Sequence, residues 1–309
     1  MSDAKGSILI SGASGLLGRA LLIALKDAGY QLYTLKLGQR GGKFGDTPNQ
    51  ILWFPEVGHI DKAALDKIEN LQGVIHLAGE NIGARWSEKK KKRILDSRVN
   101  GTDLLAKTLA QSKHPPAAFL CASGVGYYGD QGDQALTEDR PPGSGFLAEV
   151  CVSWEGAADP LREKKWRVCN LRLGMVLSGD GGALKSMVPI FKWCVGGVIG
   201  SGRQYWSWIA LEDAVSAIQY ALEKSELSGP LNFCSPQTVT AREFTKTLGR
   251  VLHRPTIFPV PSFVAKAFLG EMAEELLLSS QRAIPKKLLA AGYKFQAPDL
   301  EQALKSALK

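Results

Sequence analysis

The chain has 309 residues, of which 45% are hydrophobic and 22% charged, a balance typical of a folded globular protein. No apolar run reaches the roughly 18 residues that a membrane span needs, and the polar start Met1 to Gly6 argues against a secretory signal, so we expect a cytoplasmic protein with no membrane partner. The formal net charge of +8 favours anionic partners, among them nucleic acid, phosphorylated metabolites and phosphorylated cofactors.

The predicted elements alternate between short apolar strands and amphipathic helices along most of the chain. In chain order, we expect a strand at 7–11, a helix at 16–28, strands at 31–37 and 50–54, a helix at 61–70, a strand at 73–77, a helix at 87–111, a strand at 117–122, a helix at 146–163, a strand at 167–171, a helix at 211–222 and a strand at 229–233. Such alternation predicts βαβ units in an α/β fold, with a Rossmann-type, doubly wound and mostly parallel sheet.

The pattern changes after about Leu177. A turn-rich stretch at 178–182 and a glycine-rich loop at 195–202 precede several short helices with proline-bearing connectors. We therefore expect a nucleotide-binding domain over 1–235, in which 178–205 is an insertion, and a small, mainly helical C-terminal substrate lobe over 236–309.

The cysteines and histidines show no metal-binding or disulfide pattern. No two cysteines form a C-x-x-C pair and the histidines do not cluster, so we expect reduced thiols and no metal site. These residues are Cys121, Cys151, Cys169, Cys194, Cys234, His59, His76, His114 and His253.

A glycine-rich turn joins the first strand to the first helix. Its residues are Gly12, Ala13, Ser14, Gly15, Leu16, Leu17 and Gly18. Glycines at these spacings permit a tight turn, a close approach to a diphosphate and close packing of helix on strand, and the helix N-terminus offers free N–H groups. The turn predicts a dinucleotide site; the alternative is a tight turn without a ligand.

The end of the second strand selects between the two nicotinamide cofactors. An acidic residue there would accept the 2′-hydroxyl of NAD, but this sequence has Lys36 and then Arg40, which suit a 2′-phosphate. We therefore expect NADP(H), with surface charges as the alternative explanation of these cations.

With later stretches, these residues resemble the extended branch of the short-chain dehydrogenase/reductase superfamily, and within it the atypical epimerase family group. The matching stretches are 76–82 (HLAGENI), 85–86 (RW), 96–102 (DSRVNGT), 126–130 (GYYGD), 145–151 (GFLAEVC), 154–155 (WE), 171–174 (LRLG), 200–204 (GSGRQ), 207–209 (SWI) and 259–262 (PVPS).

The resemblance implies cofactor contacts at matching positions. The 2′-phosphate would lie beside Lys36 and Leu37, although relatives carry arginine where Leu37 stands. Arg98 would reach the cofactor or brace the loop after the fourth strand, and the stretch Leu173 to Val176 would lie near the nicotinamide. The loop itself would line the cofactor with Leu77, Ala78, Gly79 and Glu80.

The proton-transfer residues of extended relatives are replaced here. Those relatives use a Ser, a Tyr and, four residues after the Tyr, a Lys. In those relatives a Glu follows the Lys by four residues. If Glu155 is aligned with that Glu, Leu147 stands at the position of the Tyr and Cys151 at the position of the Lys, and neither residue can replace the Tyr or the Lys in proton transfer. Ser123 and Tyr127 are our candidate catalytic residues, with a packed aromatic ring as the alternative for Tyr127.

Three hypotheses about function follow. The first is an NADP(H)-dependent oxidoreductase or epimerase acting on an unidentified small carbonyl or sugar-like substrate, as a monomer or homodimer. The second is a non-catalytic NADP(H)-binding sensor or interaction protein. The third and weakest is nucleic-acid binding through the basic run 89–93, which we expect to be a solvated helix face.

Overall fold

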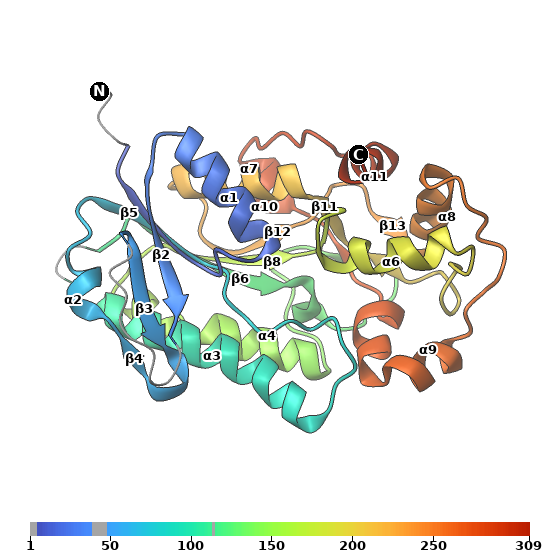
Figure 1. Cartoon of the computed structure of the whole chain (residues 1–309), viewed down its shortest axis with the longest axis horizontal. Helices are drawn as coiled ribbons and strands as arrows, with labels where there is room; N and C mark the ends of the chain where they lie inside the picture. The colour runs from blue at the N-terminus through green and yellow to red at the C-terminus, as the bar shows by residue number, and fades with distance from the viewer. Residues whose placement is uncertain (1–4, 39–47, 113–114) are drawn as a thin grey trace.

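The computed structural model describes residues 5–38, 48–112 and 115–309, and its centre is an eight-stranded sheet flanked by helices (Figure 1). The strand order is β12-β8-β6-β5-β1-β2-β3-β4, and every neighbouring pair is parallel except β3 with β4. The strands of this sheet are β1 (Ser7–Ser11), β2 (Gln31–Leu37), β3 (Gln50–Phe54), β4 (His59–Ile60), β5 (Leu71–His76), β6 (Ala118–Gly124), β8 (Val168–Leu173) and β12 (Gly229–Phe233). This order confirms the predicted Rossmann-type, doubly wound sheet.

Helices cover both faces of the sheet. One core cluster joins β1, β6 and β8 to α1 and α7, and the other joins the opposite faces of these strands to α3 and α4. The helices are α1 (Leu16–Asp27), α2 (Lys62–Leu65), α3 (Glu88–Ala110), α4 (Phe146–Gly156), α5 (Asp159–Glu163), α6 (Gly182–Lys192), α7 (Leu211–Glu223), α8 (Ala241–Val251), α9 (Ser262–Leu269), α10 (Lys286–Ala290) and α11 (Leu300–Ala307).

A third apolar cluster lies outside the sheet and joins α6, α8 and α11. Short strand pairs connect this region to the sheet: β9 (Met175–Leu177) with β11 (Trp208–Ala210), β10 (Tyr205–Trp206) with β13 (Val239–Thr240), and β7 (Ala135–Leu136) with β14 (Arg282–Ala283). The last part of the chain returns to the sheet, because Leu288 and Tyr293 belong to the first core cluster.

Two predicted helices are wrong in extent. The helix expected over 61–70 is only α2, which ends at Leu65, and Asn70 with a left-handed φ of 50° directly precedes β5. The helix expected over 146–163 breaks into α4 and α5, because Pro160 has no N–H to continue it and instead lies in the first turn of α5.

Several elements were not predicted at all. α6 occupies part of the stretch expected to be an insertion and contains Pro189, and the short strands β4, β7, β9, β10, β11, β13 and β14 have two or three residues each. These strands carry too few residues for a periodic pattern to show.

Candidate functional site

The glycine-rich turn has no space for side chains at two of its glycines. Gly12 has a φ of 69°, and a Cβ atom built on it would lie 2.8 Å from the backbone nitrogen of Ala78. A Cβ on Gly18 would overlap the carbonyl oxygen of Gly12. The backbone of the turn therefore packs directly against the carboxyl end of β5. The side of the turn that faces away from β5 stays open.

The N-terminus of α1 is free of internal acceptors. Gly15 is the N-cap, no side chain caps the helix, and its first turn contains no acidic residue. The first backbone N–H groups of a helix have no partner within it, so this end can donate to an anion.

A buried serine and histidine hold the loop after β5. The Ser11 hydroxyl oxygen accepts hydrogen bonds from the backbone N–H groups of Leu77 (3.1 Å) and Ala78 (3.2 Å) and lies 2.6 Å from Nδ1 of His76. Both side chains are fully buried. They fix the loop that approaches Gly12.

Arg98 braces the same loop from α3. Its guanidinium donates to the carbonyl oxygen of Glu80 at 3.0 Å and lies 4.9 Å from the ring centre of Trp154. A Cβ on Gly79 would contact this guanidinium. The Glu80 carboxylate lies 2.6 Å from Lys90, and this hydrogen bond lowers the pKa of Glu80. The resemblance implied that Arg98 would either reach the cofactor or brace this loop, and these contacts show that it braces the loop.

The end of β2 is open to solvent. Lys36 and Leu37 are both exposed, and Lys36 has no ion pair within the described part of the chain. Arg40 lies outside the described residues. Val176 is half-buried in β9, next to Ile209 of β11.

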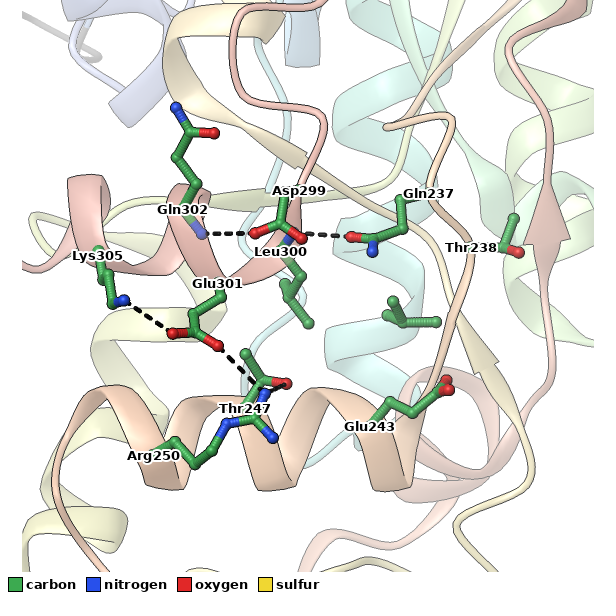
Figure 2. A pocket seen from close by; sticks show the side chains of 11 residues that line it. Gln237, Thr238, Glu243, Thr247, Arg250, Asp299, Leu300, Glu301, Gln302 and Lys305 are labelled. Carbon is green, nitrogen blue, oxygen red and sulfur yellow. Dashed lines mark hydrogen bonds and ion pairs between the residues drawn. The ribbon is translucent and has the colours of Figure 1, made fainter.

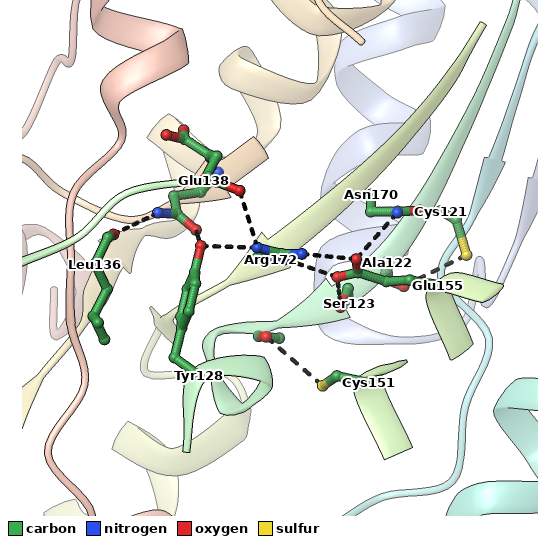
Figure 3. A network of polar contacts seen from close by, with 12 residues as sticks. Cys121, Ala122, Ser123, Tyr128, Leu136, Glu138, Cys151, Glu155, Asn170 and Arg172 are labelled. Carbon is green, nitrogen blue, oxygen red and sulfur yellow. Dashed lines mark hydrogen bonds and ion pairs between the residues drawn. The ribbon is translucent and has the colours of Figure 1, made fainter. Parts of the chain in front are cut away.

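Ser123 belongs to a buried ion-pair network that sequence reasoning missed (Figure 3). Its hydroxyl donates to Glu155 at 2.8 Å, and the same carboxylate accepts from Nε (2.8 Å) and Nη2 (2.9 Å) of Arg172. Burial alone would lower the pKa of Arg172, but the hydrogen bonds and charge of Glu155 outweigh it and raise the pKa above its usual value.

The network continues through Tyr128 to the edge strand. Arg172 donates to the Tyr128 hydroxyl at 3.0 Å, which in turn donates to Asn232 at 2.7 Å. Burial raises the pKa of Tyr128 to about 12, so this phenol stays protonated at neutral pH. The sequence signal for this network was the presence of two polar residues, Asn170 and Arg172, within the otherwise apolar strand 168–173.

Tyr127 lies beside this network but outside it. Its ring packs on the Arg172 guanidinium at 3.4 Å and meets the Tyr128 ring edge to face. Its hydroxyl makes no hydrogen bond with any described residue. Tyr127 is thus a packed aromatic and also a half-buried phenol at the carboxyl edge of β6.

The two positions on α4 that correspond to the Tyr and Lys of extended relatives hold Leu147 and Cys151, and neither side chain is charged. A Cβ on Gly126 would lie 3.1 Å from Cβ of Leu147, and the Cys151 thiol faces the Gly124 carbonyl at 3.7 Å. Burial raises the pKa of the Cys151 thiol to about 11, so it carries no charge at neutral pH. The N-terminus of α4 is occupied by Glu275, whose carboxylate accepts from the N–H groups of Phe146 and Leu147 at 3.2 Å.

Other polar residues of the matching stretches 85–86 and 200–204 are structural or peripheral. Arg85 donates to the Ala267 carbonyl, and Gln204 is buried and donates to the carbonyls of Ile199 and Leu277. Arg203 is exposed in a cleft of about 450 Å³ that also includes Asp130. Trp206 and Trp208 are core residues.

Asp213 braces rather than caps its helix. Its carboxylate accepts from the backbone N–H groups of Gln296 and Ala297, while the N-cap of α7 is Ala210.

A polar groove of about 420 Å³ lies between α8 and α11, and its lining includes no residue of the glycine-rich turn. Figure 2 shows its side chains, among which Glu301 pairs with both Arg250 and Lys305.

The basic run on α3 is largely neutralised within the protein. Lys90 and Arg93 lie beside Glu80, Lys91 beside Glu271, and Lys92 beside Asp96. Among the described residues no cluster of metal-ligating side chains occurs, and no helix there is both long and apolar enough to cross a membrane.

Comparison with known proteins shows the same organisation along the whole chain. A family model described as the NAD dependent epimerase/dehydratase family matches residues 8–233, and a domain of unknown function, DUF1731, matches 260–307. Epimerase family proteins of Mycobacterium leprae and Bacillus subtilis are 41% and 36% identical, covering 98% and 96% of this chain and 96% of each relative.

Solved structures agree. The human epimerase family protein SDR39U1, solved with NADPH, matches with a TM-score of 0.84 and 32% identity, covering 98% of this chain and 99% of that one. A UDP-galactose 4-epimerase shares the fold, with a TM-score of 0.71 and 18% identity over 98% of this chain and 97% of that one. The chain therefore belongs to the NAD dependent epimerase/dehydratase family.

Proposed function

We propose that this chain binds NADP(H) and acts as an oxidoreductase on a small carbonyl or sugar-like compound. The observation that carries the proposal is the turn from Gly12 to Gly18, which has no room for a side chain at either of these two glycines and leads into a helix, α1, whose N-terminus no side chain caps. A human relative of similar fold was solved with NADPH.

The residues divide between binding and bracing. Backbone amides of the turn would hold the diphosphate, Lys36 would pair with the 2′-phosphate, and Leu77 to Gly79 would line the cofactor, held in place by Ser11 and Arg98. When bound, NADPH supplies a hydride. We place the substrate between the sheet and a lobe formed by 236–309 with 178–205.

The chemistry would differ from that of relatives with a Tyr-Lys pair. Leu147 has no proton to give, the buried Cys151 thiol keeps its proton and carries no charge, and the Ser123 hydroxyl is committed to Glu155. We favour reduction of a carbonyl, in which NADPH would supply the hydride and the half-buried Tyr127 hydroxyl the proton, and solvent would then restore the proton to Tyr127.

Cofactor titration tests the binding part. We expect NADPH to bind more tightly than NADH, Lys36→Glu to weaken NADPH binding by about tenfold through loss of a charged contact, and Leu37→Arg to tighten it. The exposed Lys67→Glu serves as the control for overall charge. A preference for NADH, or equal weakening of both cofactors by Lys36→Glu, contradicts the proposal.

Turnover tests the chemical part. A panel of carbonyl compounds and nucleotide sugars is screened for NADPH oxidation, and Tyr127→Phe should lower kcat by about a hundredfold with unchanged cofactor affinity. Binding without turnover on the panel would favour the second candidate, a non-catalytic NADP(H)-binding protein. The apolar residues at the two α4 positions are the observation that keeps this candidate open.

A further inference from the structure

Six large apolar residues on the C-terminal side of the chain are strongly exposed. Trp193, Ile257, Phe258, Phe263 and Phe268 each leave 69–80% of their surface accessible, and Val195 leaves 60%. Isolated exposed apolar residues are ordinary, but a gathering of aromatic residues marks an interaction site. We call these six residues the apolar face.

Backbone contacts bring the two segments of the apolar face together. The Val260 N–H donates to the Val198 carbonyl at 2.8 Å, and the Gly200 N–H donates back to the Val260 carbonyl at 2.9 Å. Arg254 donates to the Lys192 carbonyl at 3.2 Å. The loop after α6 therefore runs beside the connector that leads into α9, and α6, α8 and α9 lie at one end of the molecule (Figure 1).

The charge of these segments is one-sided. Residues 181–211 and 244–270 contain no Asp or Glu, but they contain seven of the Lys and Arg residues of a chain whose net charge is +8. Arg250 pairs with Glu301 and Lys266 with Glu274, both carboxylates from other elements. The remaining five, which have no ion pair with any described residue, are Lys185, Lys192, Arg203, Lys246 and Arg254.

We propose that the apolar face is a peripheral docking surface for an anionic lipid bilayer. Exposed Trp and Phe side chains bury their rings at the level of the headgroups, and surrounding Lys and Arg are attracted to anionic lipids. A second copy of the chain fits less well, because a two-fold contact would place two surfaces of the same positive sign together. The prediction of no membrane partner rested on the lack of an apolar run long enough to span a bilayer, and a surface of this kind needs no such run.

Vesicle flotation with the full-length protein tests the proposal. We expect binding to vesicles of phosphatidylcholine mixed with phosphatidylglycerol, much weaker binding to phosphatidylcholine alone, and release by added salt. The Trp fluorescence should shift to shorter wavelength on binding in the wild type but not in Trp193→Phe.

Two sets of variants separate the apolar and charged contributions. The triple variant Trp193→Ser, Phe258→Ser, Phe263→Ser should lose vesicle binding, whereas Ile23→Ser, an equally exposed apolar site on α1, should not. Lys185→Gln with Lys192→Gln should weaken partitioning by about thirtyfold, and Lys67→Gln with Lys164→Gln should have little effect. Thermal unfolding of each variant checks that it is folded.

Three results would overturn the proposal. They are equal binding to neutral and anionic vesicles, no vesicle binding at all, or a wild-type dimer in sedimentation velocity that the triple variant converts to a monomer. The last would assign the face to a second copy. Because none of these measurements uses a nicotinamide cofactor, the proposal stands or falls independently of the proposed function.

Discussion

His76 is a buried imidazole at the point where the dinucleotide turn meets β5. Because the Ser11 oxygen already accepts from two backbone N–H groups, its own hydrogen is directed to Nδ1 of His76. The proton of the neutral ring is then on Nε2, which has no hydrogen-bond partner among the described residues. Its ring meets Trp53 in a T-shaped contact at 5.7 Å, a geometry that can place an N–H over an aromatic face.

This burial makes stability depend on pH. The pKa of His76 is lowered to about 4 from its usual 6.5, so the unfolded chain binds a proton more readily than the folded one between these values. Stability should be complete above pH 6.5 and fall as the pH drops, by about 2 kcal/mol at pH 5. Urea unfolding from pH 5 to 8 measures this, and in His76→Gln that part of the dependence should vanish. Equal slopes in both proteins would contradict the assignment.

Glu155 is the acceptor on which the buried network depends. Removing its charge with Glu155→Gln leaves the Arg172 guanidinium buried without a counter-charge, which should lower the free energy of unfolding by about 3–5 kcal/mol. The exposed pair of Lys62 and Asp66 provides the comparison, since Asp66→Asn should cost about 1 kcal/mol or less. Thermal and urea unfolding measure both variants. Similar losses of unfolding free energy in the two variants would contradict the prediction that the buried ion pair contributes more to stability than the exposed one.

At the scale of elements, the two ends of α1 separate function from stability. Gly18→Ala should push α1 and the turn apart and weaken NADPH binding by about tenfold or more, because the new methyl group overlaps the Gly12 carbonyl. Gly29, beyond the other end of the helix, has a φ of 88° with open space around it. Gly29→Ala should therefore cost about 1 kcal/mol of stability and leave the dissociation constant unchanged. Titration and unfolding of both variants distinguish the two effects.

At the scale of the whole molecule, Glu275 links the DUF1731 region to the nucleotide-binding part. Its carboxylate caps α4, close to the slots where relatives with a Tyr-Lys pair keep their catalytic groups. The Lys91–Glu271 ion pair at 2.9 Å joins the same two regions.

Glu275→Ala should uncap α4 and lower the free energy of unfolding by about 1–2 kcal/mol. The neighbouring Glu274→Ala removes only an exposed ion pair with Lys266 and should have a small effect. Urea denaturation compares the two. If both variants unfold alike, Glu275 does not hold the regions together.

Local pattern determined the sheet, the glycine-rich turn and the long helix α3. Each depends on residues close together in the chain: apolar runs of five to seven residues, glycines at fixed spacing, and Ser87, which caps α3 as an N-terminal signal should. The loss of a Tyr-Lys pair followed instead from the resemblance to extended relatives, in whose Tyr and Lys positions this sequence has Leu147 and Cys151.

Only the tertiary structure decided what the polar side chains do. Ser123 was a candidate for catalysis, yet it donates to Glu155, which is 32 residues away in the chain. Glu275 reaches α4 from 128 and 129 residues away. A side chain satisfies its hydrogen bonds with whatever the fold brings near it, and in a buried site that partner is set by packing of distant elements, which no short-range pattern records.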